Sequence, residues 1–230
     1  MKTKNLIIVF CLWAYSTKAQ IHFEVTAGIN NGNFITKADG ENIKYNKPDI
    51  GYIVTGNAYI PLSTNLLIQT GLQYESVHSK LNYIKSYVSN DMITTRTIIG
   101  TSYINYINIP VKLFYVIPAG KSYFNFGAGP YLGIGISGRT KAYDKFEITE
   151  DGVTTKTWEY NHNTKREFGS AATTLKRIGL GAGINASYIL AKSVSFNLYS
   201  NIGLTNQSNS GKSKSITYGV GIGYIFGKRK

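Results

Sequence analysis

Eight segments of this 230-residue chain alternate apolar with small or polar side chains at every second residue. A period of two is the pattern of a β-strand whose two faces meet different surroundings. Most of these segments approach or exceed the roughly 9–11 residues that a tilted strand needs to cross a bilayer. Strands of soluble proteins are shorter, with about five or six residues. The segments cover residues 22–30, 51–60, 66–75, 106–115, 124–136, 178–188, 194–204 and 216–226.

The connections between these segments alternate strictly in length. The short ones are 61–65, 118–121 and 191–192, and the long polar ones are 31–49, 77–100, 138–176 and 205–215. Transmembrane β-barrels sort their connections in this way, with short periplasmic turns and long outer loops. A soluble sandwich has no reason to do so. The pattern predicts an all-β fold, an eight-stranded antiparallel up-and-down transmembrane β-barrel.

The less apolar face of each segment carries small side chains, mostly Gly, Ser, Asn and Thr, with few charges. A sheet face in water normally carries more charge, whereas small side chains fit the narrow interior of an eight-stranded barrel. The apolar face is therefore predicted to meet lipid. The tyrosines along it suit the aromatic girdles of such barrels; they are Tyr52, Tyr74, Tyr115, Tyr188, Tyr218 and Tyr224. The alternative is a soluble lipid-carrying barrel with its apolar face inside.

The first nineteen residues differ from the rest of the chain. Lys2 and Lys4 precede an apolar stretch over residues 6–15, and Thr17 and Ala19 place small side chains three and one residues before Gln20, as a signal peptidase that cuts after Ala19 requires. The sequence predicts a signal peptide over residues 1–19 and a single barrel domain over 20–230. Cleavage would remove Cys11, the one cysteine, so the mature chain is expected to have no disulfide and no thiolate metal site.

The formal net charge of the chain is +13, and loss of Lys2, Lys4 and Lys18 with the signal peptide lowers it to +10. The charges crowd into the long connections, and no basic cluster accompanies a recognition helix or a stacking platform, so nucleic acid is not an expected partner. The expected partners are outer-membrane lipid and the phosphates of lipopolysaccharide, or a surface glycan or protein. A solvated basic surface is the alternative.

Several stretches resemble the porin-family outer-membrane β-barrel domain, namely residues 69–74, 106–111, 127–133 and the closing 221–226. The resemblance implies a small barrel of the OmpA- or OmpX-like kind in the outer membrane of a Gram-negative bacterium, and it implies little about function. One departure is the end of the chain. Barrels of this class usually finish on an aromatic residue, whereas here Phe226 is followed by the basic tail 227–230.

The sequence offers little catalytic material, and no cofactor or metal is expected. His22, His78 and His162 lack metal-ligand spacing. An enzyme that modifies lipid at the rim would need a histidine with Ser or Asp partners, and His78 beside Ser76 and Ser79 is the sole candidate. We therefore predict that the protein is not an enzyme.

Because side chains along a strand point alternately to its two faces, the alternation predicts that three charged residues point into the barrel: Glu24, Glu75 and Lys112. A charge in a narrow interior needs a partner or water. We expect Glu24 or Glu75 to pair with Lys112 and block solute flow, with separate hydration as the alternative.

The longest connection contains an Asp151-Gly152 pair between two alternating stretches, which is a strong hairpin signal. The fifth and sixth predicted strands are expected to extend beyond the membrane as a ribbon. Trp158 and Tyr160 on this ribbon would contact a partner or pack within the hairpin. Together these features predict a monomeric, non-enzymatic outer-membrane protein with a structural or surface-interaction role through its outer loops. A narrow pore is the alternative.

Overall fold

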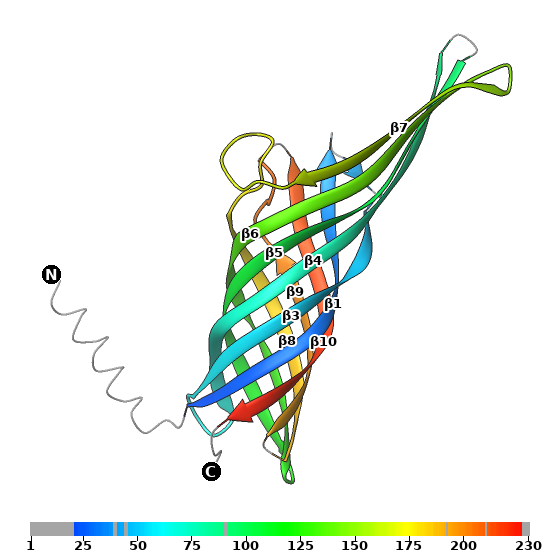
Figure 1. Ribbon diagram of the computed structural model, residues 1–230. Coiled ribbons are helices and arrows are strands. Elements are labelled where there is room, and N and C mark those ends of the chain that lie inside the picture. Colours follow the sequence, from blue (N-terminus) through cyan, green and yellow to red (C-terminus); the bar gives the residue numbers. More distant parts are fainter. Residues whose placement is uncertain are drawn as a thin grey trace, which may run out of the picture.

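The computed structural model describes residues 21–226 except 39–40, 44–45, 90–91, 192 and 210, so the predicted signal peptide and the tail 227–230 lie outside the described residues. Within the described ranges the chain forms ten strands (Figure 1). They are β1 (His22–Ala38), β2 (Glu41–Ile43), β3 (Asn46–Pro61), β4 (Leu66–Ser89), β5 (Met92–Ala119), β6 (Ser122–Glu150), β7 (Val153–Lys165), β8 (Ile178–Leu190), β9 (Val194–Gly203) and β10 (Lys212–Phe226). No helix among these residues is long and apolar enough to cross a membrane.

Eight of the strands close into an antiparallel barrel. The order β10-β9-β8-β6-β5-β4-β3-β1 is completed by pairing of β1 with β10, while β2 pairs with β1 and β7 with β6 outside the ring. Closure leaves no open edge in the wall, so the backbone groups of each strand find partners on both sides. The eight strands predicted from the alternation are all present, and the up-and-down barrel is confirmed.

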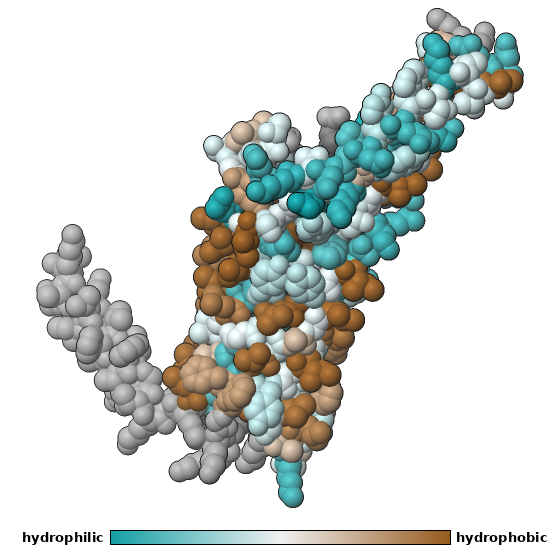
Figure 2. Space-filling model, in the orientation of Figure 1, coloured by the Kyte–Doolittle hydropathy of each residue, from teal (hydrophilic) through white to brown (hydrophobic). Residues whose placement is uncertain are grey.

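The apolar side chains point outward. Val25, Leu113 and Val220 are exposed on the barrel surface, whereas Glu24 and Thr217 are buried in the interior. Figure 2 shows the resulting apolar surface over the barrel wall. The predicted orientation is therefore confirmed, and the soluble lipid carrier, which needs its apolar face inside, is wrong for this chain.

The prediction that 77–100 is a polar loop is wrong for most of its length, whereas the ribbon predicted within 138–176 is present. β4 and β5 stay paired out to Ser89 and Met92, and β5 and β6 stay paired out to Met92 and Glu150. With β7 they form a four-stranded sheet that continues far past the rim of the barrel (Figure 1). We call it the outer sheet; it comprises residues 80–89, 92–101, 139–150 and 153–165.

The hairpin predicted at Asp151-Gly152 is confirmed. Both residues have positive φ angles, 49° and 77°, as a two-residue turn between twisted strands requires. The partner strand was predicted wrongly. β6 pairs in the outer sheet with the additional strand β7, and the sixth predicted strand, β8, begins only at Ile178, after the segment 166–177.

Candidate functional site: barrel lumen and outer sheet

Apolar side chains fill both ends of the barrel lumen. At the end with the short turns, Tyr59, Leu67, Phe114 and Val116 pack together, with the Tyr59 and Phe114 rings edge to face at 5.9 Å. At the outer end, a second cluster is capped by two residues of the segment 166–177. This cluster consists of Phe34, Val77, Ile104 and Tyr106, and the capping residues are Phe168 and Leu175.

A polar layer lies between the two clusters, and Glu24 forms its inner part. Its side chain is 2% exposed. The Tyr59 hydroxyl donates to one carboxylate oxygen at 2.5 Å and the Asn57 amide to the same oxygen at 3.3 Å. Ser195 and Asn197 donate to the other oxygen. Four donors from β3 and β9 therefore satisfy the carboxylate without a cation.

Glu75 reaches across the lumen from β4. It is 3% exposed, and it accepts hydrogen bonds from Thr217 at 2.7 Å and Asn201 at 3.5 Å on the opposite wall. Asn108 at 2.7 Å and Gln73 at 3.1 Å donate from its own side. This single carboxylate thus ties β4 and β5 to β9 and β10 through the middle of the barrel.

Lys112 is also inside the lumen, as predicted, and is 3% exposed. Its ammonium donates to Asn185 Oδ1 at 2.9 Å. Among the described residues no carboxylate lies within 4.0 Å of it, so the direct contact predicted with Glu24 or Glu75 is not present. The physical reason is that neutral amide and hydroxyl donors already occupy both carboxylates. Asn201, which donates to Glu75, packs against Gly183 beside the Lys112 side chain.

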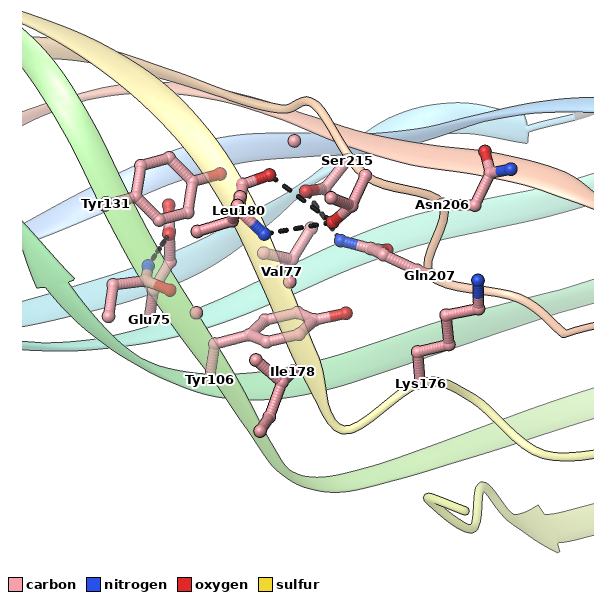
Figure 3. Close-up of a pocket in the computed structure, with 15 residues that line it drawn as sticks. Glu75, Val77, Tyr106, Tyr131, Lys176, Ile178, Leu180, Asn206, Gln207 and Ser215 are labelled. Atoms are coloured by element: carbon pink, nitrogen blue, oxygen red, sulfur yellow. Dashed lines mark hydrogen bonds between the residues drawn. The ribbon is translucent and has the colours of Figure 1, made fainter. Parts of the chain in front are cut away.

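A small cavity lies between the polar layer and the outer mouth (Figure 3). Its volume is about 20 Å³, which is room for roughly one water molecule. The Tyr106 hydroxyl and Gln207 Oε1 line it without a hydrogen-bond partner among the described residues. Figure 3 shows the Tyr106 hydroxyl on the side where Gln207 and Lys176 lie. A cavity of this size does not admit a solute.

The histidine considered for catalysis does meet a serine, since Ser76 Oγ lies 2.9 Å from His78 Nε2. Ser76, however, is 1% exposed and donates to Asn105 Oδ1 at 2.6 Å. A nucleophile so covered has no access to substrate, and no described carboxylate forms an ion pair with His78. In the described ranges, no group of three or more His, Cys, Asp or Glu side chains could hold a metal ion.

The outer sheet has two chemically different faces. One face of the outer sheet continues the lumen-facing side of the barrel wall, and the strand register places most of the large aromatic side chains there. We call this face the aromatic face. Its rings and its central cation are Tyr83, Tyr87, Arg96, Phe146, Trp158 and Tyr160, and Lys85, Ile98, Asp144 and Lys156 lie among them on the same face. The opposite face has more polar side chains, with Thr95, Thr97, Lys141, Lys145, Glu147 and Glu159, and it also carries the aliphatic Ile84, Val88, Ile93 and Ile99 and a single ring, Tyr143.

Arg96 lies at the centre of the aromatic face. Its guanidinium donates to Asp144 through two nitrogens, at 3.1 and 2.6 Å, and covers the Phe146 ring at 4.8 Å. The hydrogen bond to Asp144 raises the pKa of Arg96 above its ordinary value. Beside it, the Lys85 ammonium lies 4.7 Å from the centre of the Tyr87 ring, and a hydrogen bond with Lys85 lowers the pKa of Tyr87. The cations and rings of this face therefore hold one another in place.

Trp158 and Tyr160 are 42% and 50% exposed. The Tyr160 ring is stacked against the His162 ring, with 6.4 Å between the two ring centroids. The sequence identified these two residues but missed Tyr83, Tyr87, Arg96 and Phe146. The period-two spacing of Tyr83, Lys85 and Tyr87 could have indicated a strand face, but their position beside Trp158 depends on pairing across four strands.

This fold and its lipid-directed surface define a small outer-membrane barrel. The sequence model of the outer membrane protein beta-barrel domain family matches residues 14–209, and the chain belongs to that family. It is an outer-membrane protein of the Gram-negative type.

Solved structures with a similar fold share little sequence with the chain. Ail, the attachment invasion locus protein of Yersinia pestis, is 10% identical, with a TM-score of 0.43, over 90% of this chain and 99% of Ail. OprG from Pseudomonas aeruginosa is 12% identical, with a TM-score of 0.40, over 91% and 98% of the two chains. Neisserial surface protein A is 14% identical, with a TM-score of 0.39, over 89% and 97%. A comparison with curated proteins finds no match.

Proposed function

We propose that this chain is a monomeric, non-enzymatic surface-contact protein of the outer membrane, and that its outer sheet binds a protein outside the cell. The aromatic face is the observation that carries the proposal. Protein interfaces are enriched in Tyr, Trp, Phe and Arg and depleted in Lys, Glu and Asp. The aromatic face carries five such rings and Arg96. Lys85, Asp144 and Lys156 also lie on it, but Asp144 is paired with Arg96 and Lys85 lies against the Tyr87 ring. The opposite face carries one ring, Tyr143, beside Lys141, Lys145, Glu147 and Glu159.

The accessibility of the outer sheet supports the same function. Every residue of β7 is exposed, and β7 pairs with β6 alone. Trp158 and Tyr160 therefore stand on a strand that keeps both faces and one edge accessible. Trp, Tyr and Arg are the residue types that most often dominate binding energy at an interface. We assign Trp158, Tyr160 and Arg96 to the centre of the contact.

The filled lumen weighs against the alternative of a narrow pore. Apolar clusters occupy both ends, and the Glu75 carboxylate bridges the middle. Within this proposal Glu75 and Lys112 attract each other across Asn201, which lets two opposite charges share the interior without direct contact.

Arrays of extracellular proteins and of acidic and neutral glycans, probed with the purified full-length protein in nanodiscs, test the proposal. We expect binding on the protein array that the double substitution Trp158→Ala and Tyr160→Ala abolishes. The matched control is Thr157→Ala with Glu159→Ala, which truncates two side chains of the same strand on the opposite face. Silence on the protein array together with steady conductance in planar bilayers would favour the pore, and binding confined to the glycan array would overturn the choice of partner.

The predicted signal peptide is part of the same proposal, because a surface protein must be exported. N-terminal sequencing of protein purified from outer membranes should begin at Gln20. A mature chain that still begins at Met1 would refute cleavage after Ala19.

A further inference from the structure

Basic side chains form two rows across the base of the outer sheet on its outward face. In the first row Arg139 pairs with Tyr103 on one side and with Lys165 on the other. In the second row Lys141 pairs with Thr101, which in turn pairs with Lys80, and Lys80 pairs with Lys47. Residues directly opposite each other in an antiparallel pair point to the same face. We call this set the basic rows: Lys47, Lys80, Arg139, Lys141 and Lys165.

The basic rows lie at the upper border of the lipid-facing wall. On β6 the outward side chain of Ile136 is exposed just before Arg139. Tyr103, the strand neighbour of Arg139, belongs to a cluster of three rings. The centroid of its ring lies 5.7 Å from that of His78, which in turn lies 6.3 Å from the ring centroid of Tyr52. Aromatic girdles of this kind mark the level where lipid tails meet headgroups. Figure 2 shows hydrophilic surface over β6 and β7 directly above the apolar wall.

Three members of the basic rows lack an acidic partner. A fourth member, Lys80, meets Asp49 at 3.3 Å, and farther out Arg96 meets Asp144 at 2.6 Å and Lys145 meets Glu147 at 2.8 Å. Among the residues that the structure describes, no carboxylate lies within 4.0 Å of Arg139, Lys141 or Lys165. Arg139 and Lys165 also stand directly opposite each other, and like charges in that position destabilise a sheet.

An anion between these side chains would turn the repulsion into attraction. A guanidinium presents paired N–H donors that match phosphate oxygens, and an ammonium adds a compact charge. At the border of the outer leaflet, glycolipid headgroups supply phosphate groups.

We propose that Arg139, Lys141 and Lys165 bind a phosphate group of lipopolysaccharide in the outer leaflet. The site is separate from the aromatic face and rests on the membrane placement of the barrel, not on the proposed partner protein. It anchors the base of the outer sheet to the membrane surface.

Binding of fluorescent lipid A to the detergent-purified full-length protein tests the site. Three probes are compared: phosphorylated lipid A, the same lipid after enzymatic removal of its phosphates, and inorganic phosphate as a competitor. The test variant combines Arg139→Gln with Lys165→Gln. The control variant, Lys145→Gln with Lys156→Gln, removes the same charge from the outer sheet away from the basic rows. Heat-modifiable gel migration verifies that each variant is folded.

The wild-type protein is expected to bind phosphorylated lipid A at least about tenfold more tightly than the dephosphorylated lipid. Loss of two basic residues at a membrane surface should weaken the interaction about 30-fold, and the control variant should stay within about twofold of the wild type. Equal binding of the two lipids, or an unchanged affinity in the test variant, would overturn the site. Inorganic phosphate that binds as tightly as the lipid would overturn the lipid assignment. Binding to the protein array through Trp158 and Tyr160 should persist in the test variant. A loss of lipid A binding can therefore be told apart from a failure of the proposed function.

Discussion

The barrel wall and the outer sheet are built from the same strands, yet different forces hold them. In the wall, β6 alternates between lipid-facing residues such as Phe126 and buried ones such as Asn125. In the outer sheet, residues 145–149 of the same strand are half-buried on both faces. The wall is a closed ring around a packed interior, whereas the outer sheet is a ladder with water on both sides.

This difference predicts how damage spreads through the molecule. A lost contact in the lumen affects several strands at once, because groups such as the Glu75 carboxylate join opposite walls. A lost contact in the outer sheet should open only the local ladder, since regions with few buried contacts unfold separately from the rest.

The largest effect is expected from Glu75→Ala in the polar layer. The substitution leaves four buried donors without an acceptor, each at a cost of about 1–3 kcal/mol before the structure relaxes, so the free energy of unfolding should fall by about 3–5 kcal/mol. Urea unfolding in lipid vesicles measures the change. Glu75→Gln, which keeps the shape, should lose less. Replacement of the exposed Glu159 by Ala should lower the free energy of unfolding by less than about 0.5 kcal/mol. Equal losses for Glu75→Ala and Glu159→Ala would contradict the difference between the barrel lumen and the outer sheet.

A smaller loss is expected from Gly223→Ala, which tests how tightly the lumen is packed. The new Cβ would lie 2.5 Å from both Ser195 Oγ and Thr26 Oγ1, and overpacking of this kind costs about 1–3 kcal/mol. The matched control is Gly56→Ala on the lipid-facing side, where no atom lies within 4 Å of the added carbon. If the two substitutions had the same effect on urea unfolding, the lumen would not be the packed part of the barrel.

Gly152→Val tests whether the outer sheet unfolds separately. Gly152 has a φ of +77°, and a residue with a side chain in that region is strained by about 1–2 kcal/mol. Hydrogen exchange should accelerate in the last residues of β6 and the first of β7, while urea unfolding of the barrel stays unchanged. Gly152→Asn, which tolerates the conformation, serves as the control. Loss of protection in β8 or β9 would show that the two regions are coupled.

The smallest effect is expected from Arg96→Met. Its side chain is 41% exposed, so loss of the Asp144 interaction should cost no more than about 1 kcal/mol, seen as faster hydrogen exchange in the outer part of β5. The hydrogen bond to Asp144 raises the pKa of Arg96, so the guanidinium stays charged as the pH rises through the alkaline range. In a Tyr87→Phe background, which removes the neighbouring hydroxyl of lowered pKa, hydrogen exchange in the outer part of β5 should therefore not accelerate between neutral and moderately alkaline pH beyond the intrinsic rate, and a titration there would contradict the assignment.

The alternation predicted the wall because lipid and lumen impose opposite demands on its two faces. In the outer sheet both faces meet water, so that contrast disappears, and residues 77–89 and 92–100 resembled a polar loop although they pair as neighbouring strands. The Asp151-Gly152 turn was predictable because its positive φ angles are a local requirement. Parity likewise placed Glu24, Glu75 and Lys112 in the interior, but not their hydrogen-bond partners, which come from strands distant in the sequence.

The amino-acid sequence alone determined the number of wall strands, the face that each turns to lipid and the end of the barrel that carries the long connections. These features depend on residues close together in the chain and on the solvent that each side chain meets. The tertiary structure decided which donors surround each buried carboxylate, which segment caps the lumen and which side chains form the aromatic face and the basic rows. Those arrangements depend on strand register, which brings residues far apart in the chain to within a few ångströms of one another.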